Sequence, residues 1–382
     1  MTRAPLSRPR IMVVFGTRPE AIKMAPVVAA LRAHDTLDVR VVVTAQHRAL
    51  LDQVLAIAGI APDIDLDLMQ AGQSLHQLAA RIVTALGEAI ARERPDRLIV
   101  HGDTLTTMAA SLAAYLHRVP VAHVEAGLRS GDLLSPWPEE GNRRLTGVLT
   151  DLHFAPTEQA AAALRAENVA PDTIHVTGNT VIDALLAMRA RIARDPALAA
   201  GLDSLAARFA GKRIIGVTTH RRENFGDAMA QVARAIEQIA AREDVAVIFP
   251  VHPNPAVRPV MTAALGAHPR IALIDPLDYP HFVRLMAMSH VMLTDSGGVQ
   301  EEAPSLGVPV LVMRDTTERP EGVAAGTAAL VGTDADTIVN RMLSLLDDDD
   351  AHAAMARAHN PYGDGRAAER IARIVEHAHR PH

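Results

Sequence analysis

The sequence predicts an α/β protein with two doubly wound domains, each a parallel sheet covered by helices. Short segments rich in Val and Ile alternate with longer segments rich in Ala and Leu over almost the whole chain. The Val- and Ile-rich segments are mostly apolar, which is typical of strands buried on both faces. The alternation starts again beyond Lys212, and at about 150 residues per domain the 382 residues suffice for two or three domains.

Six strands are expected in the first half of the chain, because each is a short β-branched run between helical patterns. These strands are Ile11–Phe15, Val39–Thr44, Leu98–Val100, Val121–Val124, Leu152–Ala155 and Ile174–Thr177. The helices that alternate with them are Ala21–Ala33, Leu50–Ala58, Leu75–Arg92, Thr107–Leu116, Arg144–Thr150 and Glu158–Glu167. Residues 1–180 form the expected N-terminal domain.

Five further strands are expected in the second half, again separated by helices. They are Ile214–Val217, Val245–Val251, Ile271–Ile274, Val291–Thr294 and Val310–Met313. We assign residues 181–365 to the C-terminal domain, which begins with helix Val181–Ala193, and expect a last helix at Ala367–His379. Ligands of open α/β sheets bind beyond the carboxyl ends of the strands, so two such domains predict a site in a cleft between them.

Composition excludes several classes of function. The chain has 38 Lys and Arg against 44 Asp and Glu, and the net charge of −6 argues against nucleic-acid binding. The absence of Cys excludes disulfides, thiolate zinc sites and a Cys nucleophile, and indicates a reducing, cytoplasmic location. No apolar run approaches the roughly 18 residues that span a bilayer, and no signal peptide is expected. Without an HExxH or EF-hand pattern, we expect no protein-held metal.

The segment GTRPE (16–20) follows the first strand and allows two interpretations. Arg18 and, one turn into the helix, Lys23 could bind phosphate groups. Thr17 and Glu20 also have the spacing of a capping box, with Pro in the first helical turn. The two interpretations are compatible.

Three acidic residues follow strands or open a helix, at positions that should meet at one rim of the first domain. Asp103 follows Leu98–Val100, Glu125 follows Val121–Val124, and Glu139 opens a helix after a Pro-rich loop. A single carboxylate in such a place usually caps a helix or pairs with Arg. Three together favour general acid–base chemistry, which needs carboxylates on either side of a substrate.

An electropositive loop follows the first strand of the second domain. His220 lies there beside Arg221 and Arg222, a combination that suits an anion. His252 lies in a turn bracketed by two Pro residues, and we expect its role to be structural.

A strand-to-helix turn at residues 295–302 predicts a diphosphate site. Ser296, Gly297 and Gly298 begin a helix whose free N–H groups could bind the anion, although Ser296 could serve only as an N-cap. Glu302 could reach ribose hydroxyls, and Arg319 offers a further anion contact. The residues alone therefore predict a two-domain enzyme for a phosphorylated, nucleotide-linked substrate.

Eight segments of the chain resemble the non-hydrolysing UDP-N-acetylglucosamine 2-epimerases of bacteria. They are FGTRPEAIKMAP (Phe15–Pro26), TAQHR (Thr44–Arg48), HGDT (His101–Thr104), HVEAGLR (His123–Arg129), SPWPEE (Ser135–Glu140), HRREN (His220–Asn224), LTDSGGVQEEAPSLG (Leu293–Gly307) and RDTTERPE (Arg314–Glu321). The likeness extends from about Ile11 to the NPYGDGRA stretch at Asn360–Ala367.

The resemblance implies a GT-B-type fold of two Rossmann-like domains, with the C-terminal helix, about 366–382, packed back on the first domain. It implies reversible conversion of UDP-N-acetylglucosamine to UDP-N-acetylmannosamine by a homodimer, without NAD or a required metal. The product would supply N-acetylmannosamine units for surface polysaccharide. The family eliminates UDP to form a bound 2-acetamidoglucal, to which UDP adds back.

The resemblance also implies roles for individual residues. Those matching acidic positions of proton transfer are Asp103, Glu125 and Glu139. Those matching diphosphate contacts are Arg18, Lys23, His220, Ser296, Gly297, Gly298 and Arg319. Glu302 matches the ribose ligand and Phe282 a position near the uracil.

One departure concerns a second substrate molecule that activates some bacterial members. Gln46 and His47 match part of that region, but Ala49 and Gly72 stand where those relatives have polar side chains. Direct activation of this chain is therefore in doubt.

Two other functions fit the same sequence less well. A 2-epimerase of a related UDP-acetamido sugar remains open, because few side chains facing the pyranose can be named. A glycosyltransferase of the same fold would need an acceptor groove, of which the sequence has no sign.

Overall fold

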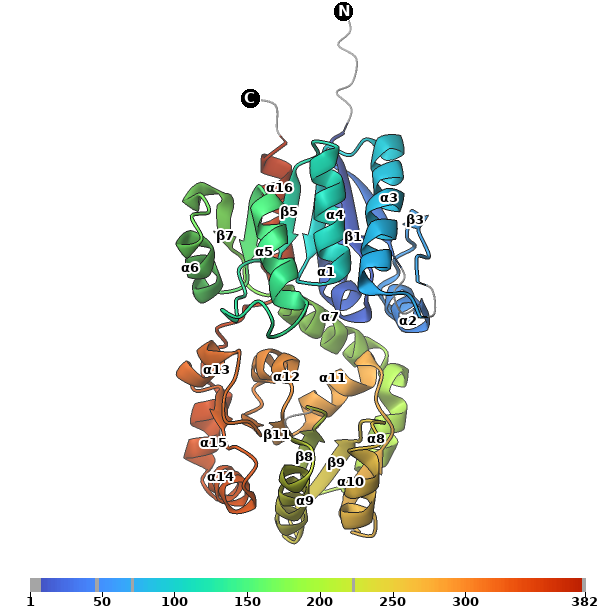
Figure 1. The fold of residues 1–382 in the computed structure, drawn as a ribbon. Helices are drawn as coiled ribbons and strands as arrows, with labels where there is room; N and C mark the ends of the chain where they lie inside the picture. The colour runs from blue at the N-terminus through green and yellow to red at the C-terminus, as the bar shows by residue number, and fades with distance from the viewer. Residues whose placement is uncertain (1–7, 45–47, 70–71, 222–223, 380–382) are drawn as a thin grey trace, which may run out of the picture. The chain divides into compact units, whose positions relative to one another are not determined.

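The computed structural model describes residues 8–44, 48–69, 72–221 and 224–379, which form two compact units (Figure 1). Unit 1 consists of Met1–Ala184 and Tyr362–His382, and unit 2 of Leu185–Pro361. The sequence-based domain limits lay at 180/181 and 365/366. Helix α7 (Thr180–Arg194) begins in unit 1 and ends in unit 2 without a break, so no loop marks the first passage, whereas the return at Pro361 and Tyr362 lies in a loop.

Unit 1 contains a seven-stranded sheet in which all neighbouring strands are parallel. The strands are β1 (Arg10–Phe15), β2 (Asp38–Val43), β3 (Ile64–Asp65), β4 (Arg97–His101), β5 (Val121–Val124), β6 (Leu152–Ala155) and β7 (Ile174–Val176). Their order is β3-β2-β1-β4-β5-β6-β7. The winding direction changes between β1 and β4, and ligands of such sheets bind at this switch point.

Helices cover both faces of the unit 1 sheet, because the side chains of each strand alternate between two apolar cores. In β1, Ile11 and Val13 belong to one core, and Met12 and Val14 to the other. The first core is covered by α1 (Arg18–Arg32), α2 (Arg48–Ala58) and α16 (Ala367–His377). The second is covered by α3 (Leu75–Glu93) and α4 (Leu105–Leu116), which lie side by side in Figure 1. The remaining helices of unit 1 are α5 (Glu139–Leu149) and α6 (Glu158–Ala166).

The last helix, α16, belongs to unit 1 although unit 2 precedes it in the chain. The carboxylate of Asp183 accepts hydrogen bonds from the backbone N–H groups of Ala367 and Ala368, at 3.2 and 2.8 Å. These groups have no partner within the helix, so Asp183 satisfies its first turn. Ile371 and Val375 are fully buried in the core against α1.

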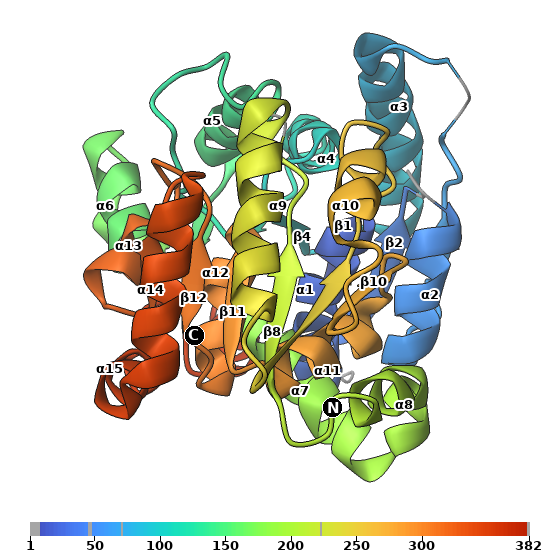
Figure 2. The ribbon, with the colours of Figure 1, turned by 90° about the horizontal axis from the view of Figure 1, so that it is seen from below.

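Unit 2 repeats the architecture with six parallel strands in the order β10-β9-β8-β11-β12-β13. The strands are β8 (Arg213–Thr218), β9 (Val245–Pro250), β10 (Ile271–Ile274), β11 (Val291–Thr294), β12 (Val310–Val312) and β13 (Ala328–Leu330). Its helices are α8 (Ala200–Ala207), α9 (Asp227–Ala240), α10 (Arg258–Leu265), α11 (Tyr279–Met288), α12 (Gly297–Glu302), α13 (Pro320–Ala324), α14 (Ala335–Asp347) and α15 (Asp349–Ala356). Figure 2 shows α9, α10 and α14 over one face of this sheet, where they enclose its larger core. The switch point lies between β8 and β11.

The predicted α/β class with two doubly wound sheets is confirmed, with differences in single elements. Strands β3 and β13 were not predicted, because β3 has only two residues and β13, with the sequence AAL, contains no β-branched residue. Helix α5 begins at Glu139 instead of Arg144, since its first turn is polar and follows Pro138. Within the described part of the chain, no helix has both the length and the hydrophobicity needed to cross a membrane.

Replacement of Gly16 by Ala should destabilise unit 1. The added Cβ would lie 2.1 Å from Oγ1 of Thr44 and 2.8 Å from Oγ1 of Thr106, two buried hydroxyls that hydrogen-bond each other at 3.0 Å. Overpacking of this kind costs about 1–3 kcal/mol. We expect a lower urea midpoint, followed by circular dichroism. Gly141→Ala is the control, because its new Cβ meets nothing within 4 Å; equal midpoints for both variants would contradict the close approach at Gly16.

Candidate functional site

Most of the predicted site residues lie beyond the carboxyl ends of strands at or next to each switch point. In unit 1 they follow β1, β4 and β5, and in unit 2 they follow β8, β11 and β12. In a parallel sheet these ends share one edge, so polar side chains distant in sequence are brought together there.

Glu20 joins two of the turns at this edge of unit 1. Its buried carboxylate accepts hydrogen bonds from the backbone N–H groups of Gly16 and Thr17, at 3.0 and 2.7 Å. Its other oxygen accepts from the hydroxyl of Thr104 at 2.7 Å, in the turn after β4. The capping box is therefore present, and it also ties the β1 turn to the β4 turn. Arg18 is exposed beside it and has no ion-pair partner among the described residues.

Glu125 is a buried carboxylate held between two nitrogen groups. Its Oε2 lies 2.6 Å from Nζ of Lys23 and 2.7 Å from Nε2 of His101. Burial would raise the pKa of Glu125, but the neighbouring Lys23 and His101 outweigh burial and hold it well below its ordinary value. Glu125 is therefore ionised in this structure. Lys23, predicted near the phosphates, here pairs with this acid.

Asp103 is bound to the first turns of α5. Its Oδ2 accepts hydrogen bonds from Nε and Nη2 of Arg143, at 2.9 and 2.6 Å. Arg143 also donates to Glu140 at 3.1 Å, and Glu140 is fully buried. The neighbouring Glu139 differs, because its Oε2 is buried and has no hydrogen-bond partner among the described residues. Glu140 therefore accepts hydrogen bonds within the structure, whereas Glu139 has a carboxylate oxygen that is available to accept one.

His123 fixes the turn that carries Asp103. Its Nε2 lies 2.7 Å from the carbonyl oxygen of Gly102, and since a carbonyl only accepts, this nitrogen carries the hydrogen. Gly102 has a φ of 69°, a left-handed conformation that favours glycine. Burial lowers the pKa of His123 from 6.5 to about 3, so the ring is neutral.

Asp295 organises the loop after β8 in unit 2. It is fully buried and accepts hydrogen bonds from the hydroxyl of Thr219 at 2.7 Å and from the backbone N–H groups of His220 and Arg221 at 3.0 Å each. Nδ1 of His220 lies 3.3 Å from its other oxygen. Burial raises the pKa of Asp295, but these donors bring it below its ordinary value. The buried charge therefore holds His220, whose side chain is half-exposed, in one position.

Two guanidinium groups lie at the start of α12. Arg319 and Arg221 each approach within 4 Å of the point where a Cβ on Gly297 would stand. Arg319 pairs with Glu301, and Arg221 with Glu318 at 2.9 Å. The missing side chain of Gly297 leaves the backbone open beside two cations, an arrangement that suits a phosphate group.

The remaining predicted residues of unit 2 lie on α11 and α12. Ser296 occupies the N-cap position, but its side chain makes no capping hydrogen bond. A Cβ on Gly298 would lie 3.5 Å from Oε2 of Glu302, so the carboxylate lies against the first turn of its own helix. Burial, and then the charge of Glu302, raise the pKa of Tyr279 well above its ordinary value, which places these two groups together. Phe282 is half-buried one turn further along α11.

Sequence reasoning missed three residues that hold the predicted ones. His101 and Asp295 end a strand or follow one directly, and Arg143 lies within the helix that Glu139 opens. Their positions in motifs at strand ends could have indicated these three residues, but a single sequence does not show which side chains pair with each other.

Gln46, His47 and Arg222 lie outside the described residues. Among those described, no group of three or more His, Asp or Glu side chains is placed to hold a metal ion.

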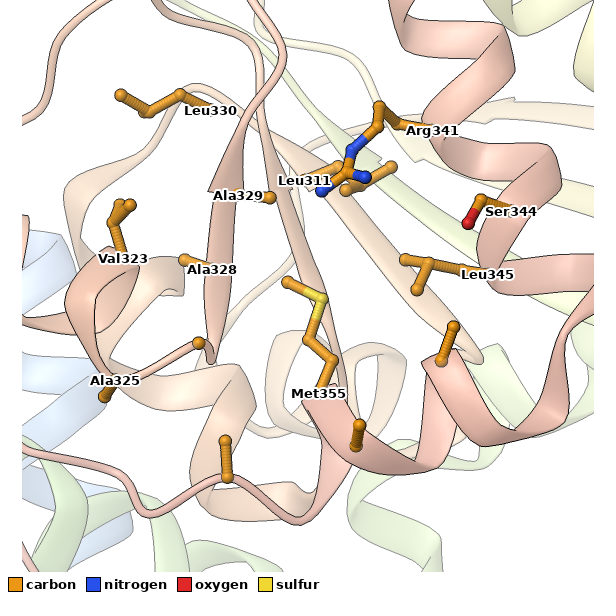
Figure 3. A pocket seen from close by; sticks show the side chains of 14 residues that line it. Leu311, Val323, Ala325, Ala328, Ala329, Leu330, Arg341, Ser344, Leu345 and Met355 are labelled. Atoms are coloured by element: carbon orange, nitrogen blue, oxygen red, sulfur yellow. The ribbon is translucent and has the colours of Figure 1, made fainter.

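A cavity of about 630 Å³ in unit 2 contains none of the predicted residues. It lies between β13, α14 and α15, and its lining includes Leu330, Leu345 and Met355, with Arg341 and Ser344 as polar groups (Figure 3). The cavity is therefore separate from the strand ends that carry the candidate site.

The buried neutral His123 should make the protein sensitive to acid. In the unfolded chain its pKa is near 6.5, and folding lowers it to about 3, so the unfolded state binds the extra proton between these values. Stability is then lost as pH falls below 6.5, by about 2 kcal/mol between pH 7 and pH 5 for one such group.

Urea unfolding of His123→Gln at the two pH values tests this, because Gln keeps a donor for Gly102 without titrating. We expect a smaller loss of stability at pH 5 than in the wild type, whereas the exposed His117→Gln should behave as the wild type does. An identical loss in His123→Gln and wild type would show that His123 is not the group responsible.

Known proteins resemble this chain over nearly its whole length. The UDP-N-acetylglucosamine 2-epimerase family model matches residues 29–376. The UDP-N-acetylglucosamine 2-epimerase of Escherichia coli K12 is 53% identical over 367 residues, which cover 95% of this chain and 97% of that protein. The crystal structure of Neisseria meningitidis UDP-GlcNAc 2-epimerase bound to UDP-GlcNAc is 45% identical, with a TM-score of 0.87 over 96% of this chain and 99% of that one. The structure of Staphylococcus aureus MnaA with UDP is also 45% identical, with a TM-score of 0.86 over 97% and 96%. This chain therefore belongs to the UDP-N-acetylglucosamine 2-epimerase family.

Proposed function

We propose that this protein interconverts UDP-N-acetylglucosamine and UDP-N-acetylmannosamine by inverting carbon 2 of the sugar. The observation that carries the proposal is Glu125, a buried carboxylate kept ionised by Lys23 and His101. A base that removes a carbon-bound proton must be ionised, and its shielding from water strengthens its interaction with the substrate. Near-full-length similarity to named epimerases supports the same reaction.

The proposed reaction is an elimination followed by a re-addition. A base takes the proton from carbon 2, the electron pair of that bond forms a double bond to carbon 1, and UDP leaves with the electrons of the bond from carbon 1 to oxygen. The 2-acetamidoglucal stays bound. UDP then adds back to carbon 1 while a proton is returned to the opposite face of carbon 2, so no redox cofactor is needed.

Groups of unit 1 are assigned to proton transfer. Asp103, Glu125 and Glu139 are the three proposed acids, one of which must act as base and another as acid in each direction. Asp103 and Glu125 are each held by nitrogen groups, and Glu139 presents a buried oxygen that has no partner in the described part of the chain. Carboxylates in environments this different can have different protonation states, as an acid and a base require.

Groups of unit 2 are assigned to the nucleotide. Arg319 and the start of α12 at Ser296, Gly297 and Gly298 would bind the diphosphate, and His220 would meet the departing UDP. Glu302 is proposed for the ribose and Phe282 for the uracil, both on the helices that adjoin this site. Arg18 and Lys23 of unit 1 are proposed as further phosphate contacts, and Arg18 already lacks an ion-pair partner among the described residues. A homodimer and a cytoplasmic location stay predictions.

The reaction predicts deuterium at carbon 2 of both sugars. In deuterated water the returning proton comes from solvent-exchanged carboxyl groups, so we expect proton NMR to show loss of the carbon 2 signal as the epimer forms. A panel with related UDP-acetamido sugars in the same assay separates the alternative epimerases. Epimer that keeps its original hydrogen at carbon 2 would rule out this mechanism.

Arg319→Ala should weaken UDP binding by roughly 10- to 100-fold, the worth of one charge-assisted hydrogen bond of about 1.5–3 kcal/mol. Calorimetric titration with UDP measures the dissociation constant. Arg341→Ala, which removes an exposed guanidinium of the separate cavity, is the matched control and should bind UDP as the wild type does. An unchanged constant in Arg319→Ala would remove this contact from the site.

A further inference from the structure

We propose that His101 is a positioning residue for Glu125, holding this carboxylate in the geometry and charge state that proton transfer at carbon 2 needs. The proposal rests on the function proposed above. It adds to the reaction a group that does not itself exchange a proton with the sugar.

Strand register brings the two side chains together. His101 is the last residue of β4 and pairs with Val124, the last residue of β5, so Glu125 is the first residue beyond the sheet. Glu125 has a φ of 61°, a left-handed conformation that is unusual for a residue with a side chain. This backbone conformation turns the chain at the strand end, and Nε2 of His101 lies 2.7 Å from Oε2. Both side chains are more than nine-tenths buried.

The polar contact of the His101 ring, between its Nε2 and Oε2 of Glu125, is the observation that carries the proposal. Nδ1 of His101 is buried and has no hydrogen-bond partner among the described residues. The same holds for Nδ1 of His123, so the open nitrogen does not by itself separate a positioning role from a structural one. The polar contact that the ring does make in the described structure is with the proposed catalytic acid.

His101 and His123 each lie on one strand and contact the turn that follows the neighbouring strand. His123, on β5, binds the carbonyl oxygen of Gly102 in the turn after β4. His101, on β4, contacts the carboxylate of Glu125 in the turn after β5. His123 therefore fixes a backbone turn, whereas His101 acts on an ionisable group and can influence its chemistry.

The consequence for Glu125 has a definite sign. Burial raises its pKa, and Lys23 and His101 lower it. Loss of His101 leaves Lys23 alone against burial, so the pKa of Glu125 rises. The rate of proton removal by an ionised carboxylate would then reach half of its maximum at a higher pH.

Two substitutions separate the roles of the ring. His101→Asn removes the nitrogen near Oε2, and His101→Gln restores a neutral donor at about the same reach. His175→Asn, which changes a half-buried histidine on β7 of the same sheet, is the matched control. The assays are exchange of the carbon 2 proton in deuterated water from pH 5 to pH 9, epimerisation turnover, and UDP titration.

We expect His101→Asn to lower exchange and turnover by roughly 100-fold, at the lower end of what acid–base catalysis contributes. Its half-maximal pH should lie above that of the wild type, with UDP affinity unchanged. His101→Gln should recover part of the rate, and His175→Asn should match the wild type. Glu125→Gln, whose side chain cannot take up the proton, gives the background rate of exchange.

Three results would overturn the proposal: wild-type exchange in His101→Asn, a rate loss without any movement of the pH profile in either variant, or equal losses in the Asn and Gln variants. If His101→Asn does not fold by circular dichroism, His101→Gln decides alone through its pH profile. Failure of the proposed function is a separate outcome, because the wild type itself would then show no exchange at carbon 2.

Discussion

Carboxylate charges buried beside nitrogen groups at strand ends are the constraint on which the candidate site depends. An isolated carboxylate away from water would be neutral, because the loss of hydration favours its protonated form. Glu125 stays ionised only because Lys23 and His101 lie within 2.7 Å of one oxygen. Parallel sheets make this possible, since side chains from β4, β5 and the helix after β1 meet at one edge without any of them being near in sequence.

A buried carboxylate also organises unit 2, where its partners belong to a loop. Asp295 is buried without contact to a lysine, and its charge is met by a hydroxyl and by backbone N–H groups of the loop that carries His220. Charges near α12 are also compensated internally, Arg319 by Glu301 and Arg221 by Glu318. A bound anion would therefore share these guanidinium groups with carboxylates already in place.

The fold was largely predictable because parallel strands buried on both faces leave an apolar signature that survives in a single sequence. Strands β5, β6, β10 and β11 have the limits that the sequence indicated. Strand β3 was missed because it has only two residues, and β13 because its sequence, AAL, contains no β-branched residue. The candidate residues followed from their positions after strands and from the resemblance to a known family. The partners of these residues could not be predicted. The sequence does not show that Lys23 pairs with Glu125, or that Glu140 and not Glu139 binds Arg143, because these pairs form only when the ends of neighbouring strands are brought together in the sheet.

The buried network also explains how fixed groups could serve the proposed elimination, in which negative charge passes from carbon 2 to the diphosphate that departs from the neighbouring carbon 1. Groups that are already oriented by neighbours need not reorganise as charge develops, which is the usual source of large electrostatic catalysis. Glu20 ties two turns of unit 1 together, His123 holds the turn before Asp103, and Asp295 holds His220. None of these three residues needs to touch a substrate for its loss to matter. The residues that hold the candidate acids and cations in place are therefore part of the site. They are brought next to those acids and cations because neighbouring parallel strands end side by side.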